Sequence, residues 1–146
     1  MVVQDRIERV VTLPVSRDRA WRAITDPAEI SRWFEPCSVL ALRPGADILL
    51  EGARGRIEAV EPPRRFAYSW HPGSEQHEET PLADLPLTLV EFILEEIPEG
   101  TRLTLNESGF ASLPSEMYER AFRENSGGWA EVIDNLVRYL GQVGEE

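Results

Sequence analysis

A periodic run of apolar residues near the end of the chain constrains the fold more than any other feature. From Ser115 to Leu140, apolar and aromatic side chains recur at steps of three and four, the spacing that lines one face of an α-helix. The stripe comprises Tyr118, Ala121, Phe122, Trp129, Val132, Ile133, Leu136, Val137 and Leu140. Pro114 suits the first turn and Gly141 the position just past the end. The pattern predicts one amphipathic helix of roughly 39 Å, which would cross a small domain from edge to edge.

Two glycines interrupt this helix in its middle. Gly127 and Gly128 each cost about 1 kcal/mol relative to alanine inside a helix, so something should offset them. Gly128 lies seven residues after Ala121 and four before Val132, which places it on or beside the apolar stripe. The pair therefore indicates either tight packing of the helix on a sheet or a gap that helps to form a cavity, and the two interpretations are compatible.

Composition limits the class of protein. A chain of 146 residues fits a single domain, residues 1–146. It lacks both an apolar run of the roughly 18 residues needed to span a membrane and a secretory signal. The single cysteine, Cys37, excludes an internal disulfide. A formal net charge of −11 opposes binding to nucleic acid or anionic membranes. We therefore expect a cytoplasmic protein that binds neither, and the sequence leaves a homodimer open.

The remainder of the chain predicts one strand, two short helices and a β-meander. Ser16 and Asp26 suit the N-caps of the two helices, and Pro27 the first position of the second. Turn residues such as Pro44-Gly45 separate short alternating segments. The expected strands are 5–13, 38–42, 47–51, 54–60, 65–71, 87–97 and 101–107; the expected helices are 17–24 and a segment from Pro27 that carries Ile30, Trp33 and Phe34. Residues 71–86 form a long unpatterned stretch, either a functional lid or a disordered loop.

These elements predict an α+β fold in which a curved antiparallel sheet of six to seven strands packs against the long helix. Phe66, Tyr68 and Trp70 should share one face of their strand, and Val90, Phe92 and Leu94 one face of theirs. These two rows and the helix stripe are the expected core. A dry cavity of about 300 Å³ would cost roughly 7 kcal/mol, comparable to the stability of a whole domain. Any cavity should therefore be small, partly polar or occupied.

Three segments resemble one known superfamily. They are Ala20-Trp21-Arg22-Ala23-Ile24-Thr25-Asp26-Pro27 with Trp33-Phe34, Thr101 to Phe110, and Asn125-Ser126-Gly127-Gly128-Trp129 with Leu136 and Tyr139-Leu140. Together they resemble the SRPBCC superfamily, and within it the branch named for the C-terminal domain of the activator of heat-shock-protein-90 ATPase. The resemblance implies the helix-grip, START-like fold, in which a six- or seven-stranded sheet wraps around the C-terminal helix, often with a hydrophobic pocket between them.

The leading hypothesis from this resemblance is a binding module for a small hydrophobic or aromatic molecule, sheltered between sheet and helix. No cofactor and no catalytic residue is expected. The alternative interpretation of the same aromatic side chains is an ordinary hydrophobic core. The candidate lining residues are Trp33, Phe34, Tyr68, Trp70, Phe92, Phe110, Phe122, Gly128 and Trp129.

Other hypotheses stay open. Some relatives are similar to cyclases, aromatases or hydrolases, which would need a buried acid or base; the candidates by strand position are His71, Tyr68, Glu51, Glu91 and Glu107, and nothing in the sequence pairs them. The family name implies a third role, a chaperone partner. His71 and His77, with Glu75, Glu78 and Glu79, could suggest a metal site, but they lie on an expected flexible loop, so we predict no metal.

Overall fold

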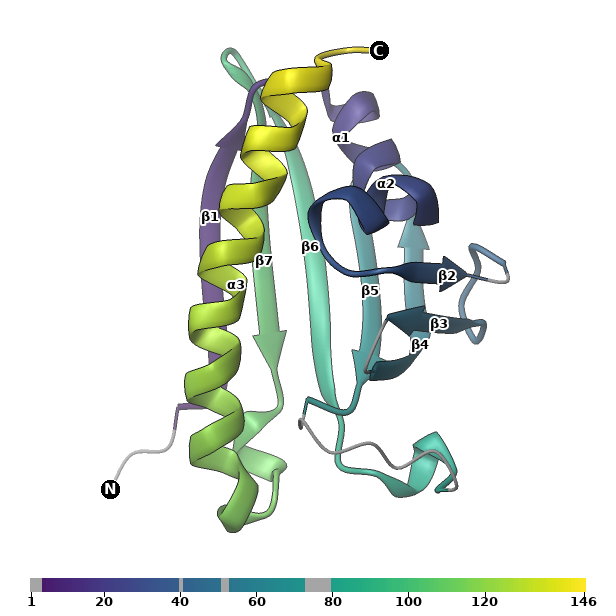
Figure 1. The fold of residues 1–146 in the computed structure, drawn as a ribbon, viewed down its shortest axis with the longest axis vertical. Coiled ribbons are helices and arrows are strands. Elements are labelled where there is room, and N and C mark those ends of the chain that lie inside the picture. Colours follow the sequence, from purple (N-terminus) through teal and green to yellow (C-terminus); the bar gives the residue numbers. More distant parts are fainter. Residues whose placement is uncertain (1–3, 40, 51–52, 73–79) are drawn as a thin grey trace.

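The computed structural model describes residues 4–39, 41–50, 53–72 and 80–146. One antiparallel sheet carries the long helix α3 (Ser115–Val143) along one face, with the short helices α1 (Arg17–Thr25) and α2 (Pro27–Trp33) beside it (Figure 1). Two single 3₁₀ turns, η1 (Leu82–Asp84) and η2 (Phe110–Ser112), complete the described elements. The α+β architecture predicted from the sequence is confirmed.

The sheet has seven strands in the order β1-β7-β6-β5-β4-β3-β2, and all neighbours are antiparallel. Consecutive strands are neighbours from β2 to β7, whereas β1 lies at the far edge beside the last strand. Sequence and structure agree to within one residue on most strand boundaries. The strands are β1 (Arg6–Leu13), β2 (Cys37–Val39), β3 (Asp47–Leu50), β4 (Ala53–Glu61), β5 (Arg65–Trp70), β6 (Thr88–Ile97) and β7 (Gly100–Ser108).

The strand predicted at 38–42 is the exception. In the structure this strand is β2, which begins one residue earlier, at Cys37, and ends at Val39. The reason is a turn that begins sooner than Pro44-Gly45 suggested: the amide of Arg43 donates to the carbonyl of Ala41 at 3.0 Å, and the amide of Ala46 to the carbonyl of Arg43 at 3.2 Å. Leu42 is consequently exposed rather than paired in the sheet.

The two short helices begin at the predicted caps. The Ser16 hydroxyl accepts from the amide of Arg19 at 3.3 Å, and a carboxylate oxygen of Asp26 accepts from the amide of Ala28 at 2.9 Å. These bonds satisfy amides that a helix leaves unpaired in its first turn. The indole of Trp33 donates to the carbonyl of Ala23 at 2.9 Å, so α1 and α2 are also fastened to each other.

The hairpin between β6 and β7 requires its glycine. Gly100 has φ +138°, and a Cβ atom there would lie 2.3 Å from the carbonyl oxygen of Leu13. Any side chain would therefore collide with the backbone that leaves β1. The glycine expected at this turn is confirmed, and the turn holds the first strand beside the last.

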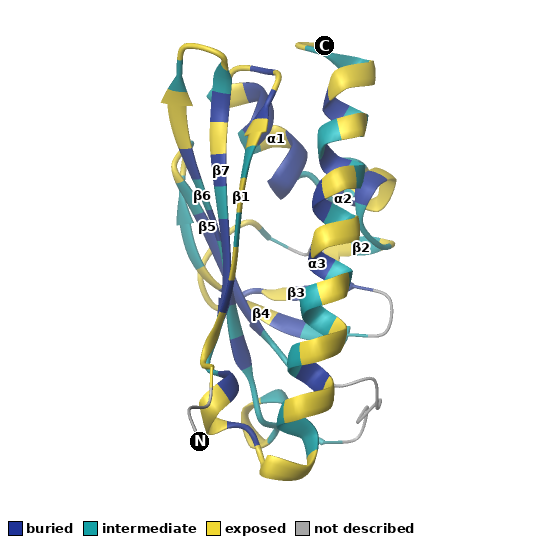
Figure 2. Ribbon diagram, turned by 90° about the vertical axis from the view of Figure 1, so that its left-hand side faces the viewer, coloured by how far each residue is buried: buried dark blue, intermediate teal, exposed yellow. Residues whose placement is uncertain are grey.

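Helix α3 is longer than predicted. It continues through Gly141 to Val143, and Gly144, with φ +60°, is the residue that ends it. The expectation that Gly141 lies past the helix end is wrong. Figure 2 shows the buried positions of α3 on the side that faces the sheet. They are Ala121, Trp129, Ile133, Leu136 and Leu140.

The C-terminal end of α3 is held by a charged cluster, which explains why the helix persists there. Nη2 of Arg19 lies 2.7 Å from Oε1 of Glu29, and the Tyr139 hydroxyl donates to the same oxygen at 2.7 Å. Nε of Arg19 also donates to the carbonyl of Gly144 at 3.0 Å. Burial raises the pKa of Glu29, but the hydrogen bonds from Tyr139 and Arg19 outweigh it, so the pKa lies below its ordinary value.

The core lies between the inner face of the sheet and the helices, as predicted. The inner rows of β5 and β6 are buried, apart from the partly exposed Trp70. The buried members are Phe66, Tyr68, Val90, Phe92 and Leu94, and β7 adds Leu103 and Leu105. The core therefore has the two predicted rows and a third row from the last strand.

Candidate functional site

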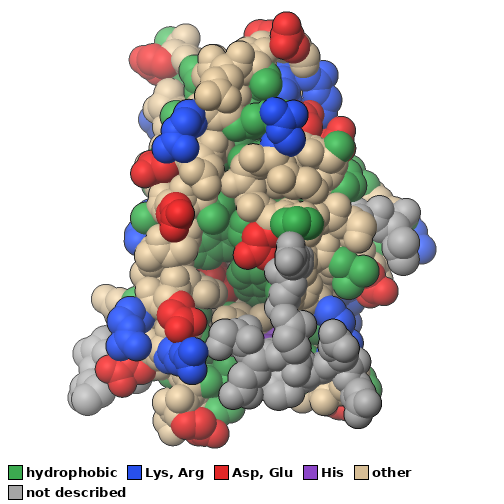
Figure 3. Space-filling model, viewed as in Figure 1, with side chains coloured by type: hydrophobic (Ala, Val, Ile, Leu, Met, Phe, Trp, Pro, Cys, Tyr) green, Lys and Arg blue, Asp and Glu red, His purple; other side chains and the backbone are tan. Residues whose placement is uncertain are grey.

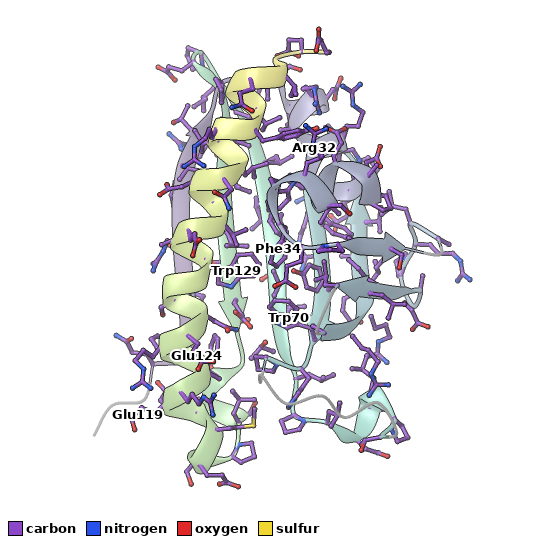
Figure 4. The ribbon with its side chains drawn as sticks, in the orientation of Figure 1. Arg32, Phe34, Trp70, Glu119, Glu124 and Trp129 are labelled. Atoms are coloured by element: carbon purple, nitrogen blue, oxygen red, sulfur yellow. The ribbon has the colours of Figure 1, made fainter. Side chains whose placement is uncertain are left out.

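Three aromatic side chains from separate elements meet between α3 and the sheet. Phe34 directly follows α2, Trp70 ends β5, and Trp129 lies in the middle of α3. Their ring centroids are 5.3 Å apart for Phe34 and Trp129, 5.9 Å for Trp70 and Trp129, and 6.2 Å for Phe34 and Trp70. Figure 4 shows the three side chains pointing toward one another in the space between α3 and the strands. We call these three residues the aromatic cluster.

A buried carboxylate lies against the aromatic cluster. Glu107, on the inner face of β7, is 0% exposed. The indoles of Trp70 and Trp129 donate to its oxygens at 2.8 and 2.7 Å, the hydroxyl of Thr88 donates at 2.5 Å, and the amide of Asn125 donates at 2.9 Å. The side chain thus binds β5, β6 and α3 to β7 at one point.

The chain reaches this arrangement through simple periodicities. Trp70 and Thr88 are paired neighbours on β5 and β6, and Asn125 and Trp129 are four residues apart on α3, hence on the same helix face. An indole N–H can only donate, so each oxygen of Glu107 must accept. Because donors occupy both oxygens, Glu107 has little capacity left to take a proton from a substrate, and its clearest role is to hold the aromatic cluster in place.

Tyr68 forms the opposite case, a buried polar group without a partner. It is 2% exposed, and its hydroxyl has no hydrogen bond within the described part of the chain. Burial raises the pKa of Tyr68 well above its usual value, and the nearby Glu107, Cys37 and Glu35 raise it further. The hydroxyl therefore stays protonated.

A small, partly open cavity of about 10 Å³ is lined by Tyr68 and its neighbours. Such a volume holds about one water molecule. Four predicted residues line it, namely Trp33, Phe34, Tyr68 and Phe92, together with Ile24, Ile30, Ile48, Leu50 and Phe66. This cavity is small, in line with the expectation for a cavity lined by apolar side chains, because aromatic rings fill much of the space around it.

The surface above the aromatic cluster is hollowed. Figure 3 shows hydrophobic side chains on the floor of a hollow between α3 and the part of the molecule that carries α2 and β2. Phe34 and Trp70 are partly exposed, although both are large and apolar. Phe34 also lines the cavity beside Tyr68.

A second, open groove of about 360 Å³ lies near β2 and β3, along Pro36, Cys37, Ser38, Leu49 and Leu50. Burial raises the pKa of the Cys37 thiol to about 11. The thiol is therefore protonated near neutral pH and a poor nucleophile.

The other predicted lining residues lie elsewhere. Phe110 and Phe122 form a separate group at the start of α3, with centroids 5.2 Å apart, and Tyr118 stacks on Phe122 at 5.8 Å. A Cβ atom added to Gly127 or Gly128 would meet nothing within 4 Å. The tight-packing interpretation of the two glycines is therefore wrong, while Gly128 still directly precedes the buried Trp129.

Of the candidate acids and bases within the described ranges, only Glu107 and Tyr68 lie at the aromatic cluster. Glu91 is on the outer face, 2.6 Å from Nη2 of Arg65, and Nδ1 of His71 is 2.8 Å from the carbonyl of Pro86. Glu51, Glu75, His77, Glu78 and Glu79 fall outside the described residues. No group of three or more potential metal ligands occurs among the residues described.

Sequence reasoning missed the partners of Glu107. It named Glu107 as a candidate acid and found nothing to pair it, whereas four side chains donate to it. The available signal was the spacing of Asn125 and Trp129 on one helix face, combined with an acid on an inward position of the last strand.

None of the helices in the described ranges is long and apolar enough to cross a membrane.

A long C-terminal helix held against a seven-stranded antiparallel sheet, with two short helices after the first strand, is the helix-grip fold of the SRPBCC superfamily. A family profile described as "Activator of Hsp90 ATPase homolog 1-like protein" matches residues 14–141. The chain therefore belongs to this family. No curated protein matches it.

Solved structures agree with the fold. Protein MLL2253 from Mesorhizobium loti is 22% identical, with a TM-score of 0.78 over 94% of this chain and 98% of that one. CalU16 from Micromonospora echinospora is 31% identical, with a TM-score of 0.67 over 92% of this chain and 74% of that one. DynU16, a protein in the dynemicin biosynthetic locus, is 25% identical, with a TM-score of 0.71; the match covers 94% of this chain and 48% of DynU16.

Proposed function

We propose that this protein binds a small hydrophobic or aromatic molecule at the aromatic cluster, between α3 and the sheet. The observation that carries the proposal is the convergence of Phe34, Trp70 and Trp129 beneath a surface hollow, with two of the three rings partly exposed. Large apolar side chains that stay accessible in a concave surface are typical of ligand sites. The relation to DynU16, which belongs to a biosynthetic locus, also favours a small organic ligand.

The rigidity of two of the three rings supports the same function. The indoles of Trp70 and Trp129 are both tied to Glu107, so these rings are already oriented and binding need not order them. Phe34 has no polar atom to tie it. It is therefore the ring that moves when a guest larger than the cavity of about 10 Å³ enters.

The first test is a thermal-shift screen of lipids, polyketides and aromatic metabolites, followed by titration of each hit. A ligand that binds only the folded state raises the free energy of unfolding. We expect stabilisation by at least one apolar compound, and an affinity about tenfold lower in Phe34→Ala, because a buried aromatic contact contributes roughly 1–2 kcal/mol.

Trp21→Ala is the matched control. Trp21 is also a partly buried aromatic residue, but it lies on α1 and contacts Phe66, with centroids 6.4 Å apart. Its removal should lower stability and leave the affinity unchanged. Absence of stabilisation by every compound, or equal loss of affinity in both variants, would refute the proposed site.

A further inference from the structure

The hydroxyl of Tyr68 differs from the other two tyrosine hydroxyls of the chain. The Tyr118 hydroxyl donates to the carbonyl of Gln4 and the Tyr139 hydroxyl to Glu29, each at 2.7 Å. The Tyr68 hydroxyl is the most deeply buried of the three and donates to nothing within the described residues. A buried donor without an acceptor is destabilising, so its persistence suggests that an acceptor comes from outside the chain.

The surroundings of the hydroxyl define that acceptor. Two carboxylates, Glu107 and Glu35, act electrostatically on the Tyr68 hydroxyl, whereas the nearby Cys37 thiol is neutral near neutral pH. A negatively charged ligand would be repelled there. Glu107 already accepts from four side chains, which leaves it little capacity to bind the ammonium group of a basic ligand. Among the described residues around this point, the Tyr68 hydroxyl is thus a buried hydrogen-bond donor available to a ligand.

We propose that Tyr68 donates a hydrogen bond to a carbonyl oxygen of the bound molecule, which makes the preferred ligand a neutral aromatic ketone. This inference rests on the proposed function and specifies its ligand class. The cavity of about 10 Å³ beside Tyr68, lined also by Phe34 and Phe92, is large enough for one oxygen atom. The rings of the ligand would occupy the space that the Phe34 side chain leaves when it moves. A site that presents a single buried donor discriminates against analogues that lack the acceptor.

The experiment compares two probes that differ in one group. Fluorenone carries a ring ketone, and fluorene has a methylene group at the same place. We expect the wild-type protein to bind fluorenone about fivefold more tightly, the factor for one net hydrogen bond. The Tyr68→Phe variant should bind both equally, whereas Tyr118→Phe should keep the preference because that hydroxyl is bonded to Gln4 at the surface.

A spectroscopic measurement tests the hydrogen bond directly, first in the wild-type protein. The carbonyl stretching band of bound fluorenone should lie at lower frequency in the wild-type protein than in an apolar solvent, because a hydrogen bond weakens the C=O bond. It should return toward the solvent value in Tyr68→Phe. An unshifted band in the wild-type protein, or a preference for the ketone that survives Tyr68→Phe, would overturn the assignment.

The outcomes separate this inference from the proposed function. Equal binding of both probes by the wild-type protein would overturn the role of Tyr68 and leave the aromatic site intact. Binding of neither, together with a negative screen, would refute both. An ordered water that stays on the Tyr68 hydroxyl when fluorenone is bound would also refute the inference, because the donor would then be satisfied without the ligand.

Discussion

Two carboxylates, one partly exposed and one fully buried, fasten α3 by different means. Glu29, near the C-terminal end of the helix, faces the guanidinium of Arg19 at 2.7 Å and also contacts Arg22 at 3.2 Å. Glu107 is on β7, opposite the middle of α3. It is surrounded by neutral donors from Trp70, Thr88, Asn125 and Trp129. One is an ion-pair cluster near the surface; the other is a hydrogen-bond network inside the molecule.

The difference shows how the chain can keep one end of α3 rigid and still hold an aromatic surface beneath its centre. Ion pairs tolerate partial exposure, and the side chain of Arg22 is 49% exposed. A fully buried carboxylate has no water to stabilise it, so every donor around it matters. The network at Glu107 should therefore be the more sensitive of the two to single substitutions.

The largest effect is expected from Glu107→Gln. The new amide group would place a donor against indole and amide donors, leaving at least one of them unpaired. We expect the free energy of unfolding to fall by about 3 kcal/mol, measured by chemical denaturation. Glu91→Gln, on the outer face beside Arg65, is the control and should cost about 1 kcal/mol or less. Equal losses would show that the network at Glu107 contributes no more to the free energy of unfolding than the partly exposed ion pair of Glu91.

Glu29→Gln should have the next largest effect, a loss of about 2 kcal/mol, because the Arg19 guanidinium, 4% exposed, would lose its charged partner. The loss should be localised. Hydrogen exchange of the amides near Gly144, which donates to Leu140, should accelerate more than that of the amides near Trp129. Uniform acceleration along α3 would contradict separate fastening of its two ends.

Acid should remove the contribution of Glu29 selectively. Its pKa is lowered in the folded protein from 4.5, so the unfolded chain binds the proton more readily and acidification favours unfolding. The stabilisation is fully present above pH 4.5 and is lost as the pH falls through the lower, folded-state value. Denaturation on both sides of pH 4.5 should show the difference between wild type and Glu29→Gln shrinking in acid. A constant difference would contradict the ion-pair description.

The smallest effect has the opposite sign. Gly127→Ala and Gly128→Ala should each raise the free energy of unfolding by about 0.5–1 kcal/mol, since alanine is the better helix former and its Cβ meets nothing within 4 Å. Gly100→Ala is the contrasting control and should be destabilising, because its Cβ would collide with the Leu13 carbonyl. If Gly128→Ala is stabilised but loses affinity for the ligand, Gly128 contributes to the binding surface.

Much of the fold could be predicted because it depends on local patterns. Strand alternation, the caps at Ser16 and Asp26 and the turn at Gly100 are set by neighbours in the sequence, and the structure follows them closely. The end of α3 was mispredicted at Gly141 because the contacts that continue it, from Arg19 and Tyr139 to Gly144 and Glu29, join segments more than a hundred residues apart. The single domain, the cytoplasmic location and a homodimer stay predictions.

The candidate site was partly visible in the sequence. Phe34, Trp70 and Trp129 were named as lining residues, and the structure brings them together. Phe110 and Phe122 were named on the same grounds and lie in a different group. An inward-facing aromatic residue can be recognised from periodicity, but which inward residues meet depends on strand register and on the rotation of α3.

The sequence by itself determined the order of helices and strands, the face that each one buries and the negative charge of the whole, because these follow from spacing and composition. Only the tertiary structure decided that Glu107 is satisfied by four side chains, while the Tyr68 hydroxyl has no partner among the residues that the structure describes. Whether a hydrogen bond forms depends on differences of a few tenths of an ångström in the donor–acceptor distance. Such distances are set where separate elements pack together, and no local pattern encodes them.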